Sequence, residues 1–453
     1  MENNTTQNQR MFSNRSLIRL LWPLVIEQAL AITVGMADTI MVTSCGEAAV
    51  SAVSSVDAIN VLLIQIFAAL ATGGAVVASQ ALGRQDRPMA CGTAKQLLYS
   101  SAALSTAVMI LILIFNKMLL QLIFGNIEAE VMRNAETYFW LSAVSYPFLA
   151  VYNSGAALFR SMGNSRVSMF VSLLINVVNI GGNALLIFVF GMGVAGAATA
   201  SLLSRAAGAV LITILLCRKS NVIFVNRLFR PEFRWGTVKN ILRIGVPAGL
   251  ENGMFQLGKL LVQSLTATFG TAAMAANAIS NSVAGFSNIP GTAIGLALIT
   301  VVGQCMGAGE PRQAQYYTKK LMLWAFALIG IMCAVIFAGA ELFVGWFALS
   351  AEATEIAVAV LRVFSIVSVM LWVPSFVLPN TLRAAGDARF TMLISVFSML
   401  VFRVGFSYFL AGAMELGVQG VWYAMEIDWF VRVLFFVPRF CSGKWKNKKV
   451  LSE

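Results

Sequence analysis

The sequence predicts an all-α polytopic membrane protein with about twelve transmembrane helices in two homologous six-helix lobes. Of its 453 residues, 58% are hydrophobic and 11% are charged, whereas soluble domains carry about 25% charged residues. About twelve apolar segments are each long enough to cross a bilayer as a helix. They begin near residues 16, 50, 92, 134, 167, 193, 240, 274, 315, 352, 389 and 417.

An internal repeat divides these segments into two halves of six. Residues in the first half recur 224 positions later without a gap, and the register continues with a one-residue slip. The aligned pairs include Arg19 with Arg243, Pro23 with Pro247, Glu27 with Glu251, Gln80 with Gln304, Gly83 with Gly307, and Phe159 with Leu382. Duplicated hydrophobic halves are typical of secondary transporters, whose binding sites lie near the membrane midplane between the repeats.

The net charge of +12 indicates membrane topology. Arg and Lys gather in alternate loops, in the segment between the halves and at the C-terminus, while the intervening loops hold only Lys117 and Arg133. Because positive residues accumulate in cytoplasmic loops, we expect both termini in the cytoplasm of a plasma membrane or bacterial inner membrane. We expect no nucleic-acid partner. The predicted parts are a cytoplasmic leader (1–15), an N-terminal lobe (16–217), a cytoplasmic linker (218–239), a C-terminal lobe (240–440) and a basic cytoplasmic tail (441–453).

The sequence lacks the residues that several classes of function require. The six cysteines include no C-x-x-C pair, so no disulfide or metal framework is indicated. The chain has no phosphate-binding G-x-x-x-x-G-K-[ST] motif, so we expect neither ATP hydrolysis nor an ATPase partner. It also has no histidine, the side chain that most readily exchanges protons near neutral pH. We therefore expect no enzyme and no cofactor, and carboxylates must carry any transported protons.

The first apolar segment carries two acids, Glu27 and Asp38. They are eleven positions apart, which places them on one helix face about 16 Å from each other. Ionisable residues within a membrane span are functional candidates by default. Burial disfavours the charged form of a carboxylate, so Asp38 could bind a proton in one state and be charged in another.

The fifth segment places three amides, Asn176, Asn179 and Asn183, on one helix face. A structural ladder of interhelical hydrogen bonds is one interpretation. The other is a cation site, because Asp38 and Asn183 both lie about two-thirds of the way outward and could meet. A hydroxyl from Thr199 or Ser201 would add to the hard oxygen ligands that a small cation prefers. This makes Asp38 a candidate sodium site, with no other metal expected.

Further polar residues predict a substrate cavity. Tyr152 and Asn153 lie too deep for the interfacial aromatic belt to which we assign Tyr138 and Trp140. In the seventh segment Lys259 follows Glu251 by eight positions, and we expect an internal ion pair. The predicted cavity residues are Glu27, Asp38, Tyr152, Asn176, Glu251, Gln256 and Lys259. We expect a structural role for the polar residues later in the second half, which would pair with one another or lie near an interface. They are Arg362, Arg403, Glu426, Asp428 and Arg432.

Five motifs resemble those of the multidrug and toxic compound extrusion (MATE) transporters. They are GMADTIM at 35–41, LFRSMGNS at 158–165 with its partner LRAAGDA at 382–388, NVVNIGGNALLIF at 176–188, GVAGAA at 193–198 and GQCMGAGEP at 303–311. Their order within two six-helix halves makes the resemblance cover nearly the whole chain. It implies an antiporter that exports small organic cations across the lipid bilayer in exchange for sodium ions or protons, by alternating access.

The resemblance also implies a cation site of Asp38, Asn179 and Asn183, with Asn153 as its member from the fourth segment. Ser201 is our own addition to this set. The resemblance places an acid of one branch of the family at the position of Trp372, so it does not support that branch's ion site in the second lobe.

A flippase for lipid-linked saccharides or polysaccharides, from the same superfamily, is the alternative function. Its cavity should be cationic in order to hold a pyrophosphate head. The only clear intramembrane cations that we expect are Lys259, Arg362 and Arg403, which favours the exporter of organic cations.

Overall fold

The computed structural model describes residues 10–125, 128–228, 230, 232–347, 349–448 and 450–451, and all regular secondary structure in them is helical. The first half forms α1 (Asn14–Thr43), α2 (Glu47–Gly83), α3 (Arg87–Phe124), α4 (Ala129–Ser161), α5 (Ser165–Asn183), the π-helix η1 (Ala184–Val189) and α6 (Gly193–Leu216). The second half forms α7 (Trp235–Ala267), α8 (Thr271–Ser287), α9 (Ile289–Gly307), α10 (Pro311–Gly345), α11 (Ala351–Trp372), η2 (Val373–Val377), α12 (Leu378–Ala384), α13 (Ala388–Ser398), η3 (Met399–Gly405), η4 (Tyr408–Ala413) and α14 (Gly417–Cys441), followed by η5 (Lys444–Asn447).

The predicted fold class is confirmed. Each predicted segment begins within five residues of the first residue of a helix. The eighth predicted segment is divided into α8 and α9 at Asn288, just before Pro290. In the described residues, nine helical stretches are long and apolar enough to cross a membrane. The division into leader, lobes, linker and tail stays a prediction. Residues 1–9 of the leader, 229 and 231 of the linker, and 449 and 452–453 of the tail lie outside the described part of the chain.

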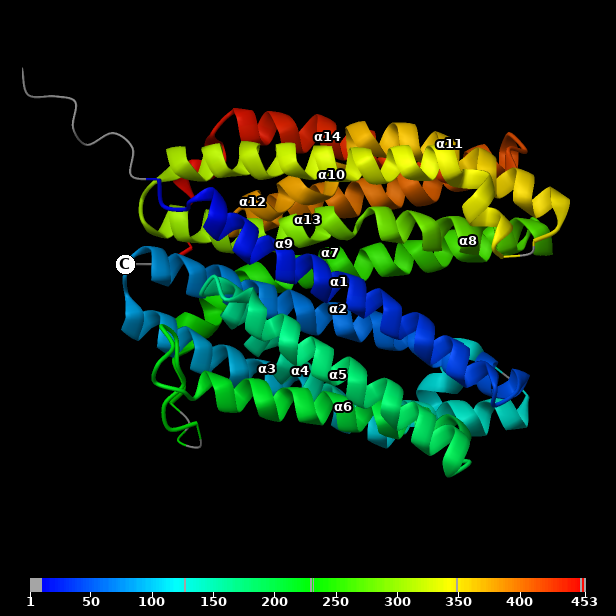
Figure 1. The fold of residues 1–453 in the computed structure, drawn as a ribbon, viewed down its shortest axis with the longest axis horizontal. Helices are drawn as coiled ribbons and strands as arrows, with labels where there is room; N and C mark the ends of the chain where they lie inside the picture. The colour runs from blue at the N-terminus through cyan, green and yellow to red at the C-terminus, as the bar shows by residue number, and fades with distance from the viewer. Residues whose placement is uncertain are drawn as a thin grey trace, which may run out of the picture.

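Helices α2–α6 gather in one lobe and α8–α14 in the other (Figure 1). The first helix of each half contacts both lobes. Helix α1 packs against α5 in its own lobe and against α9 in the other, and α7 packs against α13 and α2 in the same way. The lobes lie together at the end where the C-terminus is marked and diverge toward the opposite end (Figure 1).

Helices α2 and α9 cross between the lobes with almost no space between their backbones. A Cβ atom on Gly83 would lie 2.0 Å from the carbonyl oxygen of Gln304, and one on Gly307 would lie 2.0 Å from that of Gln80. The Gln80 amide donates to the Ala384 carbonyl at 2.8 Å, and the Gln304 amide donates to the Ser161 carbonyl at 2.7 Å. The repeat thus forms a two-fold contact, here called the inter-lobe crossing (Gln80, Gly83, Gln304 and Gly307).

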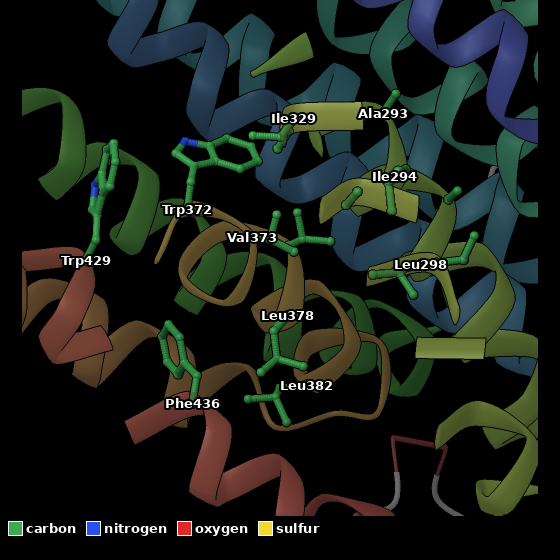
Figure 2. Packing of buried hydrophobic residues seen from close by; sticks show 14 of the residues in the cluster. Ala293, Ile294, Leu298, Ile329, Trp372, Val373, Leu378, Leu382, Trp429 and Phe436 are labelled. Atoms are coloured by element: carbon green, nitrogen blue, oxygen red, sulfur yellow. The ribbon is translucent and has the colours of Figure 1, made fainter. Parts of the chain in front are cut away.

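The core of the second lobe is filled by large side chains. Trp372 is 7% exposed and stacks on Phe376 with ring centroids 5.2 Å apart. A Cβ atom on Gly291 would lie 2.2 Å from its ring, and Figure 2 shows the indole beside Ile329. The position at which the resemblance would place an acid is therefore occupied by apolar packing.

The C-terminal tail folds back onto the protein. Trp445 is fully buried, stacks on Phe440 at 5.4 Å and donates its indole N–H to the Phe440 carbonyl at 2.9 Å. Lys448 lies 3.5 Å from the Asp387 carboxylate. The described part of the tail is thus anchored to the second lobe, and its end also reaches the first lobe, where Arg84 donates to the Leu451 carbonyl at 3.5 Å.

Replacement of Trp445 by Ala should destabilise the protein by about 3–5 kcal/mol, because it leaves a cavity in a packed region. The measurement is the melting temperature of the detergent-solubilised protein. Trp346, which is 69% exposed, provides the matched control. An equal effect of Trp445→Ala and Trp346→Ala would show that tail packing does not contribute to stability.

Candidate functional site

The structure brings Asp38 of α1 and Asn183 of α5 into contact. The Asn183 amide donates to the Asp38 carboxylate at 2.5 Å. Asn183 is the last residue of α5, directly before η1, and is 1% exposed. The proximity predicted from the depth of these two residues is therefore confirmed.

Two amide oxygens beside this contact accept no hydrogen bond. The Asn179 amino group donates to the Ser201 hydroxyl at 3.1 Å. The side-chain oxygens of Asn179 and Asn183 are both buried and accept no hydrogen bond from the described residues. A buried polar atom without a partner costs about 1–3 kcal/mol. A bound cation would offset this cost, and carboxylate and amide oxygens are the ligands that a hard cation prefers.

Other members of the predicted site are less connected. Thr199 donates to its own helix at Ala195, so Ser201 is the hydroxyl that contacts the amides. The Asn176 amino group is buried and has no hydrogen-bond partner among the described residues. Asn153 is half-buried, and its side chain forms no hydrogen bond with another described residue.

A second acid of the first lobe, Asp57 on α2, was not included in the predicted site. Its carboxylate accepts hydrogen bonds from Asn60 at 3.0 Å and from the Tyr138 hydroxyl at 3.1 Å. Tyr146 donates to the Asn60 amide at 2.5 Å. The assignment of Tyr138 to an interfacial belt is therefore wrong, because its hydroxyl points at a carboxylate within the lobe. The sequence does contain a signal for this group, because Asp57 precedes Asn60 by three positions within an apolar segment.

Arg205 on α6 was also missed. It donates to the Ser145 hydroxyl at 2.6 Å and lies close enough to Asp38 and Asp57 to interact electrostatically with both. Arg362, by contrast, forms an exposed ion pair with Glu341 at 2.8 Å. The expectation that Lys259, Arg362 and Arg403 are the only clear intramembrane cations is therefore wrong.

The repeated acids Glu27 and Glu251 occupy equivalent ion pairs, one in each lobe. Glu27 accepts from Arg160 at 2.8 Å and from Ser168 at 2.7 Å. Glu251 accepts from Arg383 at 2.7 Å and from Ser395 at 2.6 Å. Each acid ties the first helix of its half to two later helices of the same lobe.

The predicted ion pair between Glu251 and Lys259 is wrong. Eight residues of an α-helix rotate about 80° beyond two full turns, so the two side chains leave α7 in different directions. Glu251 contacts Arg383 of α12, while the Lys259 ammonium lies over the Phe255 ring at 5.9 Å.

Three of the predicted substrate-cavity residues, Glu251, Gln256 and Lys259, line two separate cavities. Glu251 and Gln256 line a cavity of about 300 Å³ that also includes Arg383 and Arg432. Lys259 lines a separate cavity of about 480 Å³. The remaining predicted members, Glu27, Asp38, Tyr152 and Asn176, line neither of these two.

Removing Arg160 should destabilise the protein by about 3–5 kcal/mol, because the buried Glu27 would lose its counter-charge. Arg160→Met and its repeat equivalent Arg383→Met should both lower the melting temperature clearly. Arg362→Met removes an exposed pair and should cost less than about 1 kcal/mol. If Arg160→Met and Arg362→Met melted alike, the Glu27–Arg160 pair would not hold the lobe together.

Comparisons with known proteins agree with this architecture. The chain matches the MatE family over residues 23–185 and 247–409, one range in each half. It is 28% identical to the probable multidrug resistance protein NorM of Thermotoga maritima, over 97% of this chain and 94% of that protein. The uncharacterized transporter YisQ of Bacillus subtilis is 25% identical, over 96% and 95% of the two chains.

A solved structure shows the same fold. An outward-facing multidrug resistance MATE transporter of the MOP superfamily superposes with a TM-score of 0.89 at 22% identity, over 99% of this chain and all of that one. The two family matches together span well over half of the sequence and coincide with the two repeats seen in the structure. The chain therefore belongs to the MATE family of multi-pass membrane transporters.

Proposed function

We propose that this protein is a secondary antiporter that exports organic cations in exchange for sodium ions or protons. One observation carries the proposal. Asp38 lies beside two buried amide oxygens, those of Asn179 and Asn183, that have no donor in the described residues. The names of relatives, which include a probable multidrug resistance protein, support the same substrate class.

The coupling follows from competition for Asp38. A charged Asp38 attracts an organic cation, and a sodium ion or proton that neutralises the carboxylate removes this attraction. The Asn179 and Asn183 oxygens and the Ser201 hydroxyl would supply further oxygen ligands for sodium. Transport against a gradient also requires each ligand to bind the two conformations with different free energy.

The inter-lobe crossing is our candidate for the closed gate. The Gly83 and Gly307 backbones meet at the end that carries Arg84, Arg87 and Arg312. If these basic loops are cytoplasmic, as the positive-inside rule predicts, the structure is open toward the outside. The return step then requires the α2–α9 contact to separate.

Uptake by proteoliposomes tests the proposal. A fluorescent organic cation such as ethidium is supplied outside, and either a sodium gradient or a proton gradient is imposed. We expect one of the two gradients to drive uptake, which also identifies the coupling ion. If neither gradient moves any cationic dye, the antiporter proposal fails and a flippase for lipid-linked saccharides becomes the leading function.

A further inference from the structure

A cavity of the second lobe is lined by two cations and several amides. Lys259 and Gln263 come from α7, Asn277 and Asn281 from α8, Arg403 from η3 and Trp422 from α14. Four separate elements therefore converge on a space of about 480 Å³. We call it the basic cavity (Lys259, Gln263, Asn277, Asn281, Arg403 and Trp422).

Neither cation of the basic cavity is neutralised by the protein. Across the described ranges of the chain, the side chains of Lys259 and Arg403 form no ion pair and donate no hydrogen bond. Arg403 is only 8% exposed, and its Nε atom is buried without a partner. Both cations lie over the Phe255 ring, at 5.9 and 5.2 Å. A cation–π contact stabilises a cation but leaves its charge and its donors uncompensated.

The acids of the surrounding helices do not supply the missing charge. No Asp or Glu is among the residues that line the cavity. Asp428 interacts with Arg403 at longer range, but it does not line the cavity, and one of its carboxylate oxygens is bound by Arg432 at 3.0 Å and by Ser398 at 2.5 Å. Glu426 on α14 does not line the cavity either. The cavity walls therefore carry two positive charges and no negative one.

The amides of the cavity present a donor as well. The Asn277 oxygen accepts from the Trp422 indole at 3.0 Å and from the Asn281 amide at 3.1 Å. These two contacts orient the Asn277 side chain, so that its amino group remains without an acceptor in the described structure. An ammonium, a guanidinium and an amide N–H are the donors that carboxylate and phosphate oxygens accept.

The basic cavity has no counterpart in the first lobe. In the repeat alignment, Lys259 corresponds to Gly35, and Arg403 corresponds to Ile180. Val262, which lines the cavity, corresponds to Asp38. The two lobes share a fold, but the positions that hold Lys259 and Arg403 in the second lobe hold no charged residue in the first.

We propose that the basic cavity is a binding site for an anionic group, such as the carboxylate, sulfonate or phosphate of an amphiphilic molecule. This proposal is based only on the side-chain contacts of the second lobe and does not depend on the proposed antiport.

Equilibrium binding of a matched pair of probes tests this site. Dansylglycine carries a carboxylate, and dansylglycinamide is the same molecule without the charge. Each is titrated against the purified protein in phosphatidylcholine nanodiscs, with binding followed by dansyl fluorescence. We expect dansylglycine to bind at least about tenfold more tightly, as charge-assisted hydrogen bonds predict. Lys259→Met should reduce this preference at least severalfold, because only Arg403 remains, and Lys259→Arg should retain it.

The controls separate the site from general charge effects. Lys259 is exposed to the cavity, so Lys259→Met should fold normally, and the melting temperature verifies this. Arg362→Met removes a cation elsewhere on the second lobe and should leave the preference intact. Equal binding of the two probes to the wild type, or an undiminished preference in Lys259→Met, would overturn the proposal.

Phosphatidylglycerol in the nanodisc distinguishes two sources of the anionic group. Competition with dansylglycine, in the wild type and in Lys259→Arg, identifies a lipid headgroup as the occupant. Unchanged dansylglycine binding identifies a soluble anion. No gradient is imposed in these titrations, so a failure of the proposed antiport would not alter their outcome.

Discussion

Replacement of Asp38 by Asn is expected to reduce gradient-driven uptake of an organic cation at least about 100-fold. The substitution keeps the size of the side chain and a hydrogen-bonding oxygen for Asn183, but it removes the charge that both ligands need. A loss of about 2.8 kcal/mol corresponds to this factor, and hydrogen bonds to charged groups contribute about 1.5–3 kcal/mol. The measurement is the initial rate of dye uptake into proteoliposomes.

Two controls show whether Asp38→Asn acts on the site. Glu341→Gln removes an exposed carboxylate of the second lobe and should transport as the wild type does. The melting temperature of Asp38→Asn should stay close to that of the wild type, since few contacts are lost. Uptake by Asp38→Asn at the wild-type rate would exclude Asp38 as the coupling acid.

Replacement of Gly83 by Val should lower transport at least about tenfold without unfolding either lobe. The first added carbon would lie 2.0 Å from the Gln304 carbonyl oxygen, and backbone atoms cannot yield as a flexible side chain can. The lobes must therefore separate at the inter-lobe crossing, because overpacking in a close contact is relieved by backbone shifts. Uptake rate and melting temperature together measure this effect.

The repeat supplies a second variant, and Gly236 near the start of α7 supplies a control. Gly307→Val places the same atoms against the Gln80 carbonyl from the other lobe and should cause a similar loss. At Gly236 an added Cβ meets nothing within 4 Å, so Gly236→Ala should transport normally. Normal transport by Gly83→Val would show that closure of the crossing is not part of the cycle.

The sequence was sufficient to predict the fold, because the hydropathy of each segment and the repeat between the halves can both be recognised without knowing how the helices pack. The starts of the helices and the two halves follow from segment length and aligned residues, whereas the break at Asn288 between α8 and α9 was not predicted. The inter-lobe crossing could not be predicted. It depends on how Gly83 and Gly307, more than 200 residues apart, meet in space, and a small residue in a membrane helix fits many packing arrangements.

The candidate site was predictable only in part. Asp38 and Asn183 were placed together by depth, since α1 and α5 start from the same side of the membrane. Helical rotation explains the error at Glu251 and Lys259. Arg403 was assigned structural pairing, but η3 is a π-helix, and its extra residue per turn alters which face a side chain takes. Its unpaired position in the basic cavity is therefore visible only in the structure.

Competition between the coupling ion and an organic cation is the most direct test of the proposed role of Asp38. Radiolabelled tetraphenylphosphonium is bound to the purified protein at equilibrium and titrated with sodium ions or with acid. The proposed mechanism predicts that one of the two displaces the probe from the wild type, and that Asp38→Asn abolishes this displacement. Displacement of equal potency in Asp38→Asn would contradict it, because the two ligands would then compete at another site.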